Sequence, residues 1–196
     1  ILESILLSYN PIFSYKSLFI KIDEKLREPR GKIYGQSITL SAHIGKDGEF
    51  VKLFVHELAH YVDIYFFLPT RTSDDPSSSF YAISWDKPTV KRSGEWIRSF
   101  VSGYAATNQY EDFAESFTFY VFHNEDFVDR ALRNESVRKK YLFFTEKLFT
   151  DGQFIWTDYS LSKVPEYVFD STKVPILLQK YLYSLKCINL HTLYLI

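Results

Sequence analysis

The feature that most constrains the fold is the stretch at residues 51–63, VKLFVHELAHYVD. It contains His56-Glu57-Leu58-Ala59-His60, which matches the pattern H-E-x-x-H. On an α-helix, residues four apart lie one above the other on one face, so both imidazoles can bind one metal ion. Glu57 lies beside that ion, where its carboxylate can take a proton from an attacking water. Two neutral imidazoles, a third protein ligand and one open position are typical of zinc, so the stretch predicts a zinc-bearing helix.

The alternative interpretation is that His56 and His60 are structural residues that hydrogen-bond to neighbours on an apolar helix. The chain has five histidines, and with so few the odds of a chance H-E-x-x-H are roughly one in a hundred. A third ligand elsewhere in the chain would favour the metal site over this alternative.

Composition is typical of an ordered globular protein. The 196 residues are enough for one domain with a substantial core, and 24% of them are charged. The formal net charge is −1 without a long basic run, which argues against a nucleic-acid partner or an anionic membrane surface. No run of about 18 apolar residues is present, so we expect no membrane span. The single cysteine, Cys187, excludes an internal disulfide.

The N-terminus does not indicate a compartment. The chain begins at Ile1 and contains no methionine, so we expect a processed or trimmed product, or a fragment. A signal peptide would not be visible in such a chain, and the localisation stays open.

Two strands are expected before the zinc helix. Residues 17–23 favour β-forming types, and residues 35–44 alternate apolar and polar side chains. Residues 24–35, with one proline and two glycines, are predicted as a turn region. The second strand is a candidate edge for an extended substrate, and a plain sheet strand is the equal alternative. His43 is interpreted as a surface or rim histidine.

The following segments are predicted to be mainly helical. The zinc helix is expected over residues 49–67, buried around most of its circumference and ended by Pro69. The segment 69–103 is long, polar and weakly periodic. It is interpreted as a loop or flap that faces substrate, with disorder as the alternative. Apolar periodicity and N-cap candidates predict three further helices, over residues 108–123, 126–133 and 136–149, the last two capped by Asn124 and Asn134.

Candidates for the third ligand lie in Glu111-Asp112-Phe113-Ala114-Glu115. The glycine and histidine that complete the metzincin pattern are absent, because Asp63 and Phe66 occupy their positions. Glu111 and Glu115 are four residues apart, so both face one side of their helix. One can bind the metal while the other hydrogen-bonds a ligand histidine. The alternative is a solvated acidic face.

Together, HELAHYVD and GYAATNQYEDFAESF resemble the catalytic core of gluzincin metallopeptidases of the anthrax lethal factor and Pro-Pro endopeptidase group. In that group a tyrosine lies seven residues before the zinc-binding glutamate, as Tyr104 and Glu111 do here. The resemblance covers residues 49–149, with 70–103 poorly matched. It implies one Zn²⁺ ion per chain, with His56, His60 and Glu111 as its ligands.

The resemblance further implies Glu57 as general base and Tyr104 as a phenol that donates to the developing oxyanion. It implies Glu115 and Asp63 as supporting residues behind the ligands. The expected activity is zinc-dependent endopeptidase hydrolysis of a peptide or protein substrate. The first alternative is a zinc- or peptide-binding module that has lost catalysis, which the intact Glu57 argues against. The second is a structural domain without metal.

The implied fold is α+β and zincin-like, as a single domain over residues 1–150. A small β-sheet and the active-site helix form the N-terminal lobe at about 1–68, residues 69–103 are the loop or flap, and 104–150 form a mainly helical lobe. Residues 151–196 are expected as an extension of short helices packed on the domain. Substrate would lie in the cleft between the lobes. The resemblance is compatible with a secreted or extracytoplasmic protein.

Overall fold

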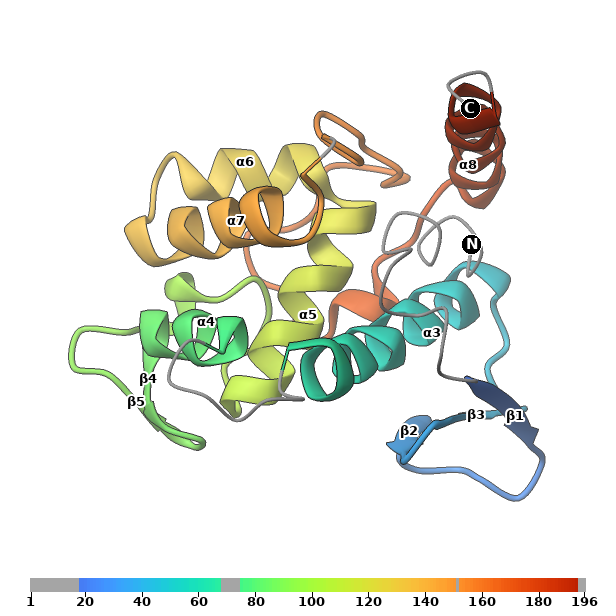
Figure 1. The fold of residues 1–196 in the computed structure, drawn as a ribbon, viewed down its shortest axis with the longest axis horizontal. Helices are drawn as coiled ribbons and strands as arrows, with labels where there is room; N and C mark the ends of the chain where they lie inside the picture. The colour runs from blue at the N-terminus through green and yellow to red at the C-terminus, as the bar shows by residue number, and fades with distance from the viewer. Residues whose placement is uncertain (1–17, 68–74, 151, 194–196) are drawn as a thin grey trace.

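The computed structural model describes residues 18–67, 75–150 and 152–193. Small sheets are combined with mostly helical structure, which confirms the α+β class (Figure 1). In chain order the elements are β1 (Phe19–Asp23), β2 (Gly31–Tyr34), β3 (Ser37–Ser41), α3 (Asp47–Tyr61), a π-helical turn (Val62–Phe67), α4 (Pro76–Ser84), β4 (Trp85–Lys87), β5 (Val90–Lys91), a 3-10 turn (Ile97–Ser99), α5 (Gln109–Phe122), α6 (Asn124–Ala131), α7 (Glu135–Lys147), a second 3-10 turn (Ser171–Lys173) and α8 (Leu178–Leu193).

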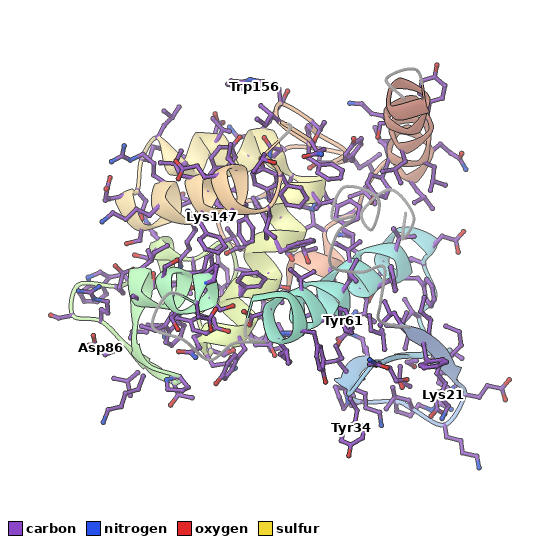
Figure 2. The ribbon with its side chains drawn as sticks, viewed as in Figure 1. Lys21, Tyr34, Tyr61, Asp86, Lys147 and Trp156 are labelled. Carbon is purple, nitrogen blue, oxygen red and sulfur yellow. The ribbon has the colours of Figure 1, made fainter. Side chains whose placement is uncertain are left out.

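The three-stranded sheet has the order β1-β3-β2, with β1 parallel and β2 antiparallel to β3. Ile38 and Leu40 of β3 are fully buried, and β2 and β3 pack on α3. On the outside of the sheet, the labelled side chains of Lys21 and Tyr34 project away from the helices (Figure 2), and Tyr34 is 88% exposed. The sheet therefore uses one side to support α3.

Two predictions for this region need correction. The predicted turn region at 24–35 contains β2, which was missed because only Ile33 and Tyr34 of its four residues are apolar. The predicted strand before the helix is β3, which is the middle strand with both edges paired. It therefore cannot offer a free edge, and the alternative of a plain sheet strand holds. His43 is exposed, as predicted.

α3 is buried along most of its length, from Lys52 to Tyr61, as predicted for the zinc helix. Beyond Tyr61 the chain continues as the π-helical turn to Phe67, which is where the predicted helix ends. Pro69 lies outside the described residues. Single turns of π-helix within α-helices are frequent at functional sites.

α5 forms the centre of the helical part, with Asp112 to Phe122 all buried. It packs against α3 on one side and against α4, α6 and α7 on the others (Figure 1). The predicted N-cap Asn134 accepts a hydrogen bond from the backbone N–H of Val137. Asn124 does not cap its helix: α6 starts directly after α5, and the Asn124 side chain donates to the carbonyl of Tyr120.

Residues 76–103 are not the long loop that the sequence suggested. They form α4, the β4–β5 hairpin and a 3-10 turn, and α4 packs on α5 and α7. Phe80 of α4 is fully buried and its ring meets the edges of Phe113 and Phe143. The prediction failed because α4 is only nine residues long and serine-rich, which leaves little periodicity to detect.

Residues 152–177 are mostly irregular and return to the centre of the molecule. Their 3-10 turn contacts both α3 and α5, and lies between these helices in Figure 1, drawn in orange-red. α8 follows as a single helix of 16 residues, where short helices were expected. None of the helices in the described ranges has the length and hydropathy that a bilayer crossing requires.

Candidate metal centre

The candidate site lies where α3 and α5 pack together. α3 carries His56, Glu57 and His60, and α5 carries Glu111 and Glu115. α5 begins at an asparagine N-cap, Asn108, whose side chain accepts from the N–H of Glu111 at 3.0 Å. Glu111 therefore lies in the first helical turn, where the helix dipole favours a negative charge.

The two predicted histidines and Glu111 converge on one point. The Nε2 atoms of His56 and His60 lie 3.2 Å and 3.4 Å from the same carboxylate oxygen, Oε2 of Glu111. Ligand atoms about 2.0–2.1 Å from a tetrahedral zinc ion are about 3.3 Å apart, so this spacing fits one ion. Oε2 is buried, and its contacts with the two rings lack hydrogen-bond geometry. The cluster could hold a metal ion.

Glu115 lies behind His56. Its Oε1 is 3.0 Å from Nδ1 of His56, on the side of the ring away from Glu111, in an ion-pair contact that lacks hydrogen-bond geometry. Its Oε2 accepts hydrogen bonds from the Ser102 hydroxyl at 2.6 Å and from the backbone N–H of Ser171 at 2.9 Å. A carboxylate fixed in this way orients the imidazole so that Nε2 points to the metal position. The sequence predicted Glu115 in this role, but not its two donors.

The carboxylates also set the charge of the site. Burial alone disfavours a charged imidazole, but Glu111 and Glu115 raise the pKa of His56 to about 10. Although burial works in the opposite direction, His56 and His60 hold the pKa of Glu111 below its usual range. Without metal, the two carboxylates therefore favour the protonated form of His56. A metal ion replaces that proton, because only a neutral imidazole can be a ligand.

Metal uptake is therefore expected to release about one proton per chain at pH 7.5. Below the raised pKa of His56, the apparent affinity should rise with pH by about tenfold per unit, because the concentration of protons that compete with the metal for the imidazole falls tenfold. Calorimetric titration of Zn²⁺ in buffers with different ionisation enthalpies measures the proton count. A heat of binding that is the same in all buffers would contradict this arrangement.

Glu57 lies next to the cluster and lines an open cleft. The cleft is bordered by α3, by the start of β2 and by the segment that includes Phe169 and Asp170. The Glu57 side chain is 6% exposed. Burial raises its pKa, which His56 and His60 partly offset. A carboxylate with a raised pKa at the edge of a cleft is suited to accept and return a proton.

Tyr104 borders the same cleft from the loop before α5. Its backbone N–H donates to the carbonyl of Phe169 at 2.6 Å, and its ring is stacked against His56 with centroids 6.1 Å apart. Burial, together with the nearby carboxylate of Glu111, raises the pKa of the phenol. The phenol therefore keeps its proton at neutral pH and can donate it in a hydrogen bond.

Asp63 is fully buried in the π-helical turn after His60. Its carboxylate accepts hydrogen bonds from the hydroxyls of Ser77 and Tyr81, both on α4. Burial raises its pKa to about 6, against the effect of these two donors. Asp63 thus attaches the end of α3 to α4. Its predicted role was a support for the ligands, and the contacts with α4 could not be foreseen.

The centre defined here is a buried cluster of two histidines and a glutamate, next to a further glutamate and a tyrosine that line a cleft. Comparisons of the chain with family models, curated proteins and solved structures found no significant match. The functional argument therefore depends on the residues and geometry of the site.

Proposed function

We propose that this protein is a zinc-dependent endopeptidase of the gluzincin type, on a zincin-like fold. The observation that carries the proposal is the convergence of His56, His60 and Glu111 on one point, with Glu57 beside them in a cleft. The separate resemblance of HELAHYVD and GYAATNQYEDFAESF to the lethal factor and Pro-Pro endopeptidase group supports the same assignment.

Zinc is the metal that the donor set favours. Two imidazole nitrogens and one carboxylate oxygen are the ligands of several catalytic zinc sites, which leave the fourth position open. Among the residues that the structure describes, the cluster contains neither a cysteine ligand nor the oxygen-rich set that magnesium or calcium prefers. When bound, zinc would lower the pKa of a water molecule and polarise a carbonyl group.

The residues around the cluster supply the rest of the chemistry. Glu57 takes the proton of the attacking water and later delivers it to the amine that leaves. The Tyr104 phenol donates a hydrogen bond to the oxygen that becomes negative in the tetrahedral intermediate, a contribution often worth about 3 kcal/mol. Glu115 keeps His56 in the orientation that points Nε2 to the metal.

A peptide is the substrate that suits the cleft. β2 is an edge strand, and its first residue, Gly31, lies in the cleft next to Glu57. An extended peptide can add to such an edge by backbone hydrogen bonds, which are independent of its sequence. An open cleft with the start of an edge strand at its border can accept the middle of a chain, which favours an endopeptidase.

The direct test is digestion of a mixed peptide library, followed by mass spectrometry of the products. We expect internal cleavage that stops with a zinc chelator and returns when Zn²⁺ is added back. Bound zinc with no cleavage, but with retention of library peptides, would instead support the alternative of a binding module without catalysis. A protein that binds neither zinc nor peptides would contradict both assignments.

Gly31→Ala is expected to lower kcat by roughly 10–100-fold, because it displaces the proposed base. A Cβ at this position would overlap Oε1 of Glu57 and lie 2.8 Å from its Cγ and Cδ. The Glu57 side chain can move away at little cost in stability, but then it no longer reaches the water. Gly45→Ala is the matched control, since a Cβ there meets nothing within 4 Å. Equal loss of kcat in both variants, or in neither, would contradict the role of Gly31.

A further inference from the structure

Residues 168–174, named here the strap, run along the candidate site although they are distant from it in sequence. The carbonyls of Val168 and Phe169 accept the N–H groups of Gly103 and Tyr104 at 2.8 Å and 2.6 Å. Farther along, Arg30 donates to Asp170 and Thr172. The strap therefore connects the loop that carries Tyr104 with the start of β2.

The centre of the strap contacts the carboxylate behind His56. Ser171 is the first residue of the 3-10 turn, and its N–H donates to Oε2 of Glu115 at 2.9 Å. The donor of this hydrogen bond is the backbone of Ser171, and the Ser171 side chain does not take part in it. The position of Glu115, and through it of His56, thus depends on where the strap backbone lies.

The residue that fixes the strap backbone is Lys52. Its Nζ group donates to the carbonyl of Ser171 at 2.8 Å and to the carbonyl of Val174. Burial lowers the pKa of this amine to about 7, and it can donate both bonds with or without its charge. Lys52 lies on α3 one turn before His56, and is 1% exposed. Burying the polar end of a lysine is costly unless its N–H groups are hydrogen-bonded. Its two bonds to the strap suggest that it is there to anchor these residues.

We propose that Lys52 is a positioning residue of the metal centre. Its Nζ group holds the strap, the Ser171 N–H of the strap holds Glu115, and Glu115 orients the His56 imidazole. The inference rests on the proposed function for the identity of the ion. The connection from Lys52 to His56 runs through contacts that exist without metal.

Lys52→Met removes the Nζ group and keeps most of the side-chain volume. We expect the variant to bind Zn²⁺ about 10–100-fold more weakly than wild type, as loss of a group behind a metal ligand commonly does. The visible absorption spectrum of the Co²⁺-loaded protein should change as well. A variant that is only less stable would keep both the affinity and the spectrum of its folded fraction.

A matched pair at Ser171 tests the same connection without touching Lys52. Ser171→Pro removes the N–H that Glu115 accepts, while Ser171→Ala removes the hydroxyl and keeps the N–H. Proline is tolerated at the first position of a helical turn, and Asp170 before it has ψ 113°, which suits a residue preceding proline. We expect weaker zinc binding in Ser171→Pro and wild-type binding in Ser171→Ala.

A readout without metal separates this inference from the proposed function. Imidazole ¹⁵N shifts of His56 at fixed pH, recorded on the metal-free protein, should change in Lys52→Met and Ser171→Pro but not in Ser171→Ala. A wild-type chain that binds no zinc would contradict the proposed function. The His56 shifts of the metal-free variants would still decide whether the strap positions His56. If Lys52→Met does not fold, the Ser171 pair decides. His56 shifts equal to wild type in Ser171→Pro would overturn the role of the strap, and with it that of Lys52.

Discussion

Glu57→Gln is expected to lower kcat by about 10²–10⁴-fold while zinc content stays at that of the wild type. Glutamine has the shape of glutamate but cannot accept the proton of the attacking water. Glu57 is not among the three residues whose atoms converge at the cluster, so its replacement leaves the ligand set complete. Peptide turnover and metal content, measured on the same preparation, test both parts of the expectation.

The control for Glu57→Gln is thermal unfolding with zinc present. The side chain is buried, and exchanging a carboxylate with a raised pKa for a neutral amide should change the melting temperature little. Turnover within a few-fold of the wild type would show that another group acts as the base. Loss of zinc together with activity would show that Glu57 helps to bind the metal.

Glu111→Ala is expected to weaken zinc binding by more than about 100-fold, beyond the usual effect of losing a group behind a ligand. Oε2 of Glu111 faces the Nε2 atoms of both histidines, so alanine removes one ligand and leaves two imidazoles alone. Competition with a chromogenic chelator measures the affinity. Glu115→Gln should have a smaller effect, because it changes the orientation of His56 rather than the ligand count.

Glu125→Ala is a suitable control for Glu111→Ala. Glu125 is an exposed carboxylate in the first turn of α6, outside the cluster, and its loss changes the net charge by the same amount. Equal zinc affinity in wild type and Glu111→Ala would place the third ligand elsewhere. Glu115 and Asp63 would then be examined next.

The sequence predicted the elements that carry the site, because their signals are local. H-E-x-x-H fixes the face of α3 through the spacing of four, and the same spacing places Glu111 and Glu115 on one face of α5. Both helices were found at nearly their observed bounds. That the two faces meet could only be expected from the resemblance, since no local pattern gives the packing of α3 against α5.

The parts that the sequence did not predict depend on backbone groups from distant segments. The bond between Ser171 and Glu115 spans 56 residues, and that between Lys52 and Ser171 spans 119. A backbone N–H or carbonyl is present in nearly every residue, so neither bond has a sequence signature. A lysine one turn before His56, in the buried part of α3 and next to Leu53 and Phe54, was a signal that could have led to the strap.

α4 and β2 were missed for a different reason. Each is short, and its apolar residues are too few to establish a period. Both nevertheless support the site, since α4 binds Asp63 and the first residue of β2 contacts Glu57. Because residues 69–103 were predicted as a loop, the contacts of α4 that fix the C-terminal end of α3 were missed.

The most direct test of the account is anomalous diffraction at the zinc absorption edge from crystals of the wild-type protein. We expect one peak per chain, about 2.0–2.2 Å from Nε2 of His56, Nε2 of His60 and a carboxylate oxygen of Glu111. A peak at other residues, or crystals of zinc-saturated protein with no peak between α3 and α5, would contradict the assignment of this cluster as the metal centre.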